Sequence, residues 1–98
     1  MQPMTFDQLK NIVDSQIQST TTEFNLALKG SIEAKRDSSF VIYFSDIRRN
    51  ELNGIKCLIF QFRLNEIMDE SEYVALSSKI QAAADDIFRL AIEYKKPQ

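Results

Sequence analysis

The first part of the chain carries apolar residues at the spacing of a helix. Thr5 and Gln8 stand three residues apart, as in a capping box, where the hydroxyl and the amide satisfy free backbone donors of the first turn. Met4 and Leu9 have the spacing of a hydrophobic staple, and the apolar stripe continues at helical spacing. The pattern predicts a helix over about residues 5–19. Three threonines follow at 20–22 and are expected to end it, because β-branched residues lose rotamer freedom in a helix.

Three later segments show the alternation of a β-strand. Residues 23–29 alternate apolar and polar positions, which predicts a half-buried strand, although Gly30 could also end a short second helix there. Residues 40–47 and 55–64 are rich in β-branched and aromatic residues, and Asn53-Gly54 between them is a hairpin signal. A three-residue loop with Gly54 in the left-handed conformation gathers most large apolar side chains on one face. That face consists of Phe40, Ile42, Phe44, Leu58, Phe60, Phe62 and Leu64.

The last third of the chain has the pattern of a long amphipathic helix. It begins near residues 69–71, where acidic side chains suit the positive end of the helix dipole, and ends near Tyr94, before Lys95 and Lys96. Its apolar face is formed by Tyr73, Leu76, Ile80, Ala83, Ala84, Ile87, Leu90, Ala91 and Tyr94. The predicted fold is a single α+β domain over residues 1–98. Its order is α-β-β-β-α, a three-stranded antiparallel meander with both helices packed on one face.

Composition removes most catalytic chemistry. The chain has no histidine, one cysteine and two glycines, so a zinc site, a Cys–His nucleophile and a phosphate-cradling loop cannot be assembled. Asp69, Glu70 and Glu72 are interpreted as helix-capping charges, and Asp85-Asp86 as a solvated helix face. The cluster of Asp46, Arg48 and Arg49 is either an anion site or a solvated strand end. We therefore expect no enzyme, no metal and no cofactor.

The predicted sheet leaves one mixed face without a helix over it. This face is either solvated or an interface with a partner or a second copy, because apolar patches often mark interfaces. The last helix widens its apolar surface on one flank. The predicted partner-binding residues are Tyr43, Ile47, Ile59, Gln61 and Arg63 on the sheet, with Phe88 and Ile92 on the helix.

These expectations favour a non-enzymatic protein–protein interaction module: a chaperone, adaptor or inhibitor, acting as a homodimer. In size, acidity and opening helix the chain is similar to class I type III secretion chaperones. One alternative is a nucleic-acid-binding domain, since residues 77–84 resemble the last helix of double-stranded RNA-binding domains, which share the α-β-β-β-α order. The net charge of −2 disfavours that alternative. Another is a structural subunit of a larger assembly.

A cytoplasmic location is expected for three reasons. The chain has a single cysteine, its N-terminus has no basic start followed by an apolar stretch, and its longest strongly apolar run is Cys57 to Phe60.

Overall fold

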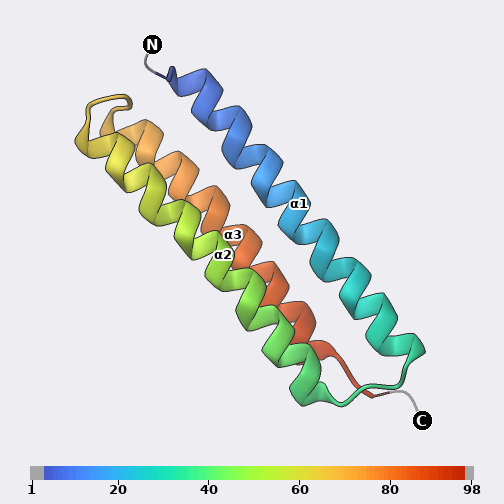
Figure 1. Ribbon diagram of the computed structural model, residues 1–98. Helices are drawn as coiled ribbons and strands as arrows, with labels where there is room; N and C mark the ends of the chain where they lie inside the picture. Colours follow the sequence, from blue (N-terminus) through green and yellow to red (C-terminus); the bar gives the residue numbers. More distant parts are fainter. Residues whose placement is uncertain (1–3, 97–98) are drawn as a thin grey trace.

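The protein is a bundle of three long helices. The computed structural model describes residues 4–96, and these form α1 (Phe6–Glu33), α2 (Ser38–Leu64) and α3 (Glu70–Glu93). Short turns make consecutive helices antiparallel, so the start of α1 and the α2–α3 turn share one end of the bundle (Figure 1). The Cα trace is a flat rod of 54 × 22 × 14 Å. The predicted α+β meander is wrong, because residues 4–96 contain no β-strand.

Helix α1 starts as predicted and continues much further. The capping box is confirmed. The backbone N–H of Gln8 donates to the Thr5 hydroxyl at 3.2 Å, and the backbone N–H of Thr5 donates to the side-chain oxygen of Gln8 at 2.9 Å. The helix then runs through the three threonines, because Thr20 and Phe24 extend the buried stripe at four-residue spacing. Packing of that stripe outweighs the weak helix preference of threonine. The predicted end at residue 19, the strand at 23–29 and the helix stop at Gly30 are therefore wrong.

Helix α2 replaces both predicted central strands and the hairpin between them. Its inward residues recur with alternating spacings of three and four, the period of a packed helix. This core line consists of Val41, Ser45, Arg48, Leu52, Ile55, Ile59 and Phe62, all buried or half-buried. Asn53 and Gly54 lie within the helix, and no described glycine has a positive φ. The hairpin signal failed because the helical period continues unbroken across it.

Lysine and glutamate hold the turns instead of glycine. Lys35 and Glu66 have φ values of 54° and 62°, in the left-handed region. At each, two backbone hydrogen bonds close a Schellman motif. After α1, the Arg36 N–H donates to the Ser31 carbonyl and the Lys35 N–H to the Ile32 carbonyl; after α2, the Ile67 N–H donates to the Phe62 carbonyl and the Glu66 N–H to the Arg63 carbonyl. The two helix ends are therefore well capped without glycine.

Helix α3 matches its prediction closely. Asp69 caps it and forms a capping box with Glu72, and every residue of the predicted apolar face is buried or half-buried. At its far end the Tyr94 hydroxyl lies 2.7 Å from the Arg36 carbonyl and 3.1 Å from the Ser31 carbonyl. This contact fastens the end of α3 to the α1–α2 turn.

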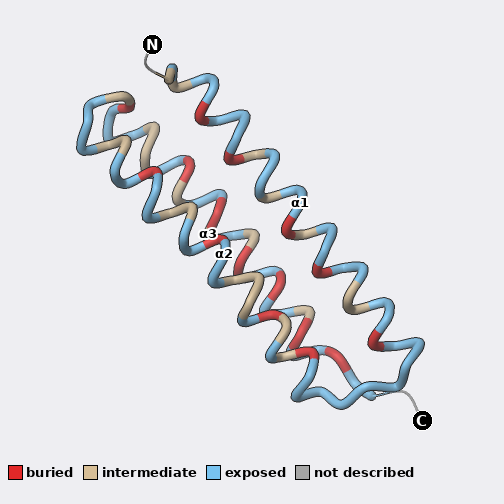
Figure 2. Tube along the Cα trace, viewed as in Figure 1, coloured by how far each residue is buried: buried red, intermediate tan, exposed pale blue. Residues whose placement is uncertain are grey.

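A single core runs the length of the rod, on the inward faces of all three helices (Figure 2). Its buried hydrophobic residues are Leu9, Val13, Phe24, Val41, Leu52, Ile59, Met68, Leu76, Ile80, Ala84, Ile87, Ala91 and Tyr94. Helices α2 and α3 pack against each other far more extensively than either packs against α1. The buried residues of α2 (Val41, Ser45, Leu52 and Ile59) all lie on its inward side, and its outward side is mostly exposed.

Candidate protein-docking face

The outward side of α2 carries a second line of residues with the same spacing as its core line. This outer line consists of Phe40, Tyr43, Ile47, Asn50, Gly54, Cys57, Gln61 and Leu64. Seven of the eight are exposed and Ile47 is half-buried. The relative accessibility of Tyr43 is 65% and that of Leu64 is 61%. Over its full length, about 36 Å, the line itself contains no charged side chain. Charged side chains border its first end, where the Arg36 guanidinium carbon lies 4.5 Å from the centre of the Phe40 ring and Lys35, Asp37 and Lys96 line a groove with Phe40 and Tyr43.

The flanks of the outer line add to its apolar character. Leu58 and Phe60 lie on either side of its second half, and both are exposed. Among residues 4–96, five of the eleven exposed large hydrophobic residues belong to α2. A surface helix of a monomeric protein normally places charged and polar residues on its outward face. This face of α2 is instead composed like a surface that contacts protein.

Gly54 stands near the centre of the outer line. A Cβ atom placed there would meet no side chain and no backbone beyond its own helical turn within 4 Å, so packing inside the chain does not require glycine. Glycine in a helix interior destabilises the helix by about 1 kcal/mol relative to alanine. Gly54 has no side chain and Cys57 has a small one, so the outer line is shallow in its middle and higher at the large residues of its two ends.

The structure separates the predicted partner-binding residues into three groups. Tyr43, Ile47 and Gln61 lie on the outer line of α2. Ile59 is 0% exposed in the core and has no surface to offer a partner. Arg63 is half-buried and lines a surface groove with Phe60 and Tyr73, between the end of α2 and the start of α3.

The remaining two predicted residues, Phe88 and Ile92, are exposed on α3. The Arg49 guanidinium lies 4.5 Å from the centre of the Phe88 ring, so an intramolecular cation–π contact partly covers that ring. Sequence reasoning missed Phe40 and Leu64 as surface residues, because it assigned them to the covered face of a sheet. The signal that finds them is the uncharged three-and-four spacing from residue 40 to residue 64.

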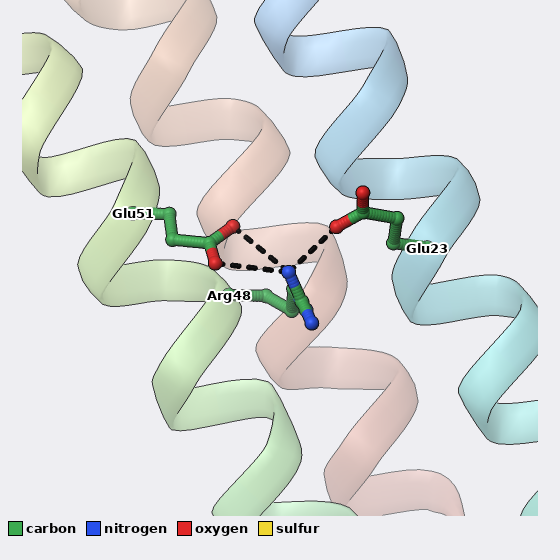
Figure 3. A network of polar contacts seen from close by, with 3 residues as sticks. All are labelled: Glu23, Arg48 and Glu51. Atoms are coloured by element: carbon green, nitrogen blue, oxygen red, sulfur yellow. Dashed lines mark hydrogen bonds and ion pairs between the residues drawn. The ribbon is translucent and has the colours of Figure 1, made fainter.

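Arg48 occupies a core-line position but reaches out to the surface with its charge. Its side chain is only 19% exposed, and its Nη1 lies 2.6 Å from a Glu23 oxygen on α1 and 2.9 Å from a Glu51 oxygen on α2 (Figure 3). Its guanidinium carbon also lies 4.9 Å from the centre of the Phe44 ring. The network joins α1 to α2 and partly offsets the charge of Glu51, the acidic residue nearest the middle of the outer line, because Arg48 shares its single positive charge between two carboxylates. Asp46 and Arg49, interpreted from the sequence as part of an anion site or a solvated strand end, lie on a helix and form an ion pair within α2, with an N–O distance of 3.6 Å.

The two ends of the rod carry opposite charge. At the end with the α1–α2 turn, residues 29–37 and 93–96 hold five basic and three acidic side chains. At the other end, residues 5–10 and 63–72 hold two basic and five acidic side chains. Within this end, hydrogen bonds to the Asp69 carboxylate from the Glu72 backbone N–H and, to a smaller extent, from the Ser71 hydroxyl lower the pKa of Asp69.

Other surface features give no sharper site. An open groove of about 700 Å³ lies between the first halves of α1 and α3, lined by Phe6, Lys10, Ser71, Glu72, Ala75, Leu76, Ser78 and Lys79. Within residues 4–96 no three His, Cys, Asp or Glu side chains are grouped so that they could hold a metal ion. None of the three described helices is both long and apolar enough to cross a membrane.

Comparison with known proteins gives no relative from which to transfer a function. No protein family, no curated protein and no solved structure matches the chain.

Proposed function

We propose that this chain is a non-enzymatic protein–protein interaction module that binds a helical partner along the outer line of α2. The observation that carries the proposal is an outer line of uncharged residues about 36 Å long on an exposed helix face, with charged side chains only beside it and at its two ends. Burying an exposed apolar surface of this extent against a partner lowers the free energy, because it removes that surface from water. A partner helix with its own apolar stripe fits such a face best, because helices pack by interlocking side-chain rows.

The alternative functions have less support. The resemblance to double-stranded RNA-binding domains rested on the α-β-β-β-α order, which the helical bundle lacks. The excess of positive charge at the end with the α1–α2 turn is small, and the whole chain has a net charge of −2. We propose a cytoplasmic location, and the free, exposed Cys57 supports it because a reducing compartment keeps such thiols reduced.

Site-specific photo-crosslinking in native cells tests the docking face. A photoreactive amino acid replaces Tyr43 in one version of the chain and Ser15, exposed on α1, in a matched control. The expected result is a covalent adduct from position 43 and none from position 15, with the second polypeptide identified by mass spectrometry. The adduct is expected to disappear when Leu64→Glu places a charge on the outer line. The proposal fails if position 43 gives no adduct, or the same adducts as position 15.

A further inference from the structure

The outer line of α2 is suited to pairing with an antiparallel copy of itself. Its eight residues are spaced symmetrically about the level of Leu52 along the helix. A two-fold axis at that level brings Phe40 opposite Leu64 of the second copy, and Tyr43 opposite Gln61. Nearer the axis, Ile47 faces Cys57 and Asn50 faces Gly54. Large side chains then meet at both ends, and small ones meet where the two helices cross.

Charge favours the same antiparallel direction. The two helices would overlap fully, so the end of one copy with excess basic residues would lie beside the end of the other with excess acidic residues. The two-fold axis produces this match twice. A parallel pair would place like-charged ends together, which opposes association. Glu51, close to the axis, is already paired with Arg48 in its own chain at 2.9 Å.

The antiparallel arrangement gives a reason for a glycine at position 54, which the packing of the single chain does not give. A Cβ placed at Gly54 would meet no side chain and no backbone beyond its own helical turn within 4 Å, so the space beside Gly54 is open to the outside of the molecule. Opposite Asn50 and beside the axis, that space lets two helix backbones approach closely. Close approach increases the contact between the larger side chains at each end of the line.

We infer that this chain forms a two-fold symmetric dimer in which the outer lines of two α2 helices pack antiparallel, with Gly54 at the crossing point. The inference rests on the proposed function, because it names a second copy as the partner of that docking face. The interface is isologous, so it closes with two copies and leaves no free docking face for a third.

The first test measures the solution mass by light scattering over a range of concentrations, for the wild type, Gly54→Leu and Gly30→Leu. Both glycines are exposed, a Cβ at either position meets open space in the monomer, and leucine is a better helix former than glycine. Gly54→Leu is therefore expected to stay folded and to raise the dimer dissociation constant about tenfold or more. Gly30→Leu is the matched control on α1 and is expected to dimerise like the wild type.

Three outcomes of this measurement would overturn the inference. They are a wild type that stays monomeric up to about 1 mM, a dimer that Gly54→Leu does not weaken, and a mass that grows beyond two copies. The last would favour a subunit of a larger assembly. A monomeric wild type with a specific adduct at position 43 would overturn the dimer and leave the proposed docking face intact. Loss of both results would remove the docking face itself.

The second test reads the direction of the helices through thiols. In the antiparallel dimer the two Cys57 residues lie about 15 Å apart, too far for a disulfide, whereas position 47 faces Cys57 of the other copy. Ile47→Cys is therefore expected to give a disulfide-linked dimer on oxidation with diamide, and the wild type is not. Adding Cys57→Ser to Ile47→Cys is expected to abolish the link. Direct Cys57–Cys57 linkage in the wild type would show a parallel pair and overturn the inference.

Discussion

At the scale of single residues, the chain places its glycines and its turn residues in the opposite way from the usual pattern. Gly30 and Gly54 lie inside helices, while Lys35 and Glu66 take the left-handed backbone at the two Schellman turns. A residue with a Cβ atom in that conformation carries about 1–2 kcal/mol of strain. The chain tolerates it because the turn hydrogen bonds and the packing of the adjoining helices hold the backbone there.

This strain can be measured with Lys35→Gly. Glycine adopts a positive φ without strain but loses more backbone entropy on folding, so the free energy of unfolding is expected to rise by about 0.5–1 kcal/mol. Urea denaturation provides the measurement. Lys29→Gly, at an exposed position inside α1, is the control and is expected to lower the free energy of unfolding by about 1 kcal/mol. Equal destabilisation by both changes would show that Lys35 is not strained.

At the scale of elements, the sequence predicts α1's start and all of α3 but not α2. Local chemistry alone predicts two helix starts: a capping box at Thr5, and acidic residues that suit the helix dipole at Asp69, where the structure adds a second capping box. Helix α2 lacks such a box, since the Asp37 side chain makes no cap hydrogen bond. It is also apolar on its inner and outer lines, so parts of it alternate like a strand. Helix and strand patterns of this kind cannot be separated by periodicity in short windows.

The candidate docking face is hard to find from the sequence because parts of α2 alternate like a strand. Tyr43, Ile47 and Gln61 were identified as surface residues on a sheet, and they lie together on α2 because their spacing also fits a helix. Ile59 shares the alternation of the sheet face but belongs to the core line of the helix. Only the pairing of the helices decides which apolar line is inside, and that depends on contacts between residues distant in sequence.

Arg48 shows how a charged residue can occupy a core position of α2. Its aliphatic stem fills space between helices while the guanidinium reaches Glu23 and Glu51 at the surface. Because Glu23 and Glu51 are about half exposed, the ion pairs are expected to add little net stability, and the buried stem more.

Two substitutions at position 48 separate these contributions. Arg48→Met keeps the volume of the stem and is expected to leave the free energy of unfolding within about 1 kcal/mol of the wild type. Arg48→Ala removes the stem and is expected to lower it by about 1–2 kcal/mol. Both values come from urea denaturation. If Arg48→Met is as destabilising as Arg48→Ala, the ion pairs contribute more than the packing.

At the scale of the whole molecule, the three helices are not held equally. Helices α2 and α3 form the most extensive contact, and α1 lies along that hairpin with less contact to each partner (Figure 1). Helix α1 adds core residues such as Leu9, Val13 and Phe24. It also forms two ion pairs with the other helices, Glu23–Arg48 and Asp14–Lys79. Three of the four charged side chains in these pairs are 39–52% exposed and Arg48 is 19% exposed, so water screens both pairs and most of the stability of α1 docking comes from the apolar contacts.

This difference predicts the order in which the bundle opens. Native-state hydrogen exchange at low denaturant is expected to give α1 amides a lower opening free energy than amides in the middle of α2 and α3, because fewer contacts hold α1. Covering the outer line of α2 with a second copy would not change that order, since the dimer adds contacts to α2 and none to α1. The measurement compares amides buried at mid-helix, near Thr20 in α1 and near Ile80 in α3. Identical opening free energies at the two places would mean that α1 is as firmly held as the hairpin and that the bundle unfolds as one unit.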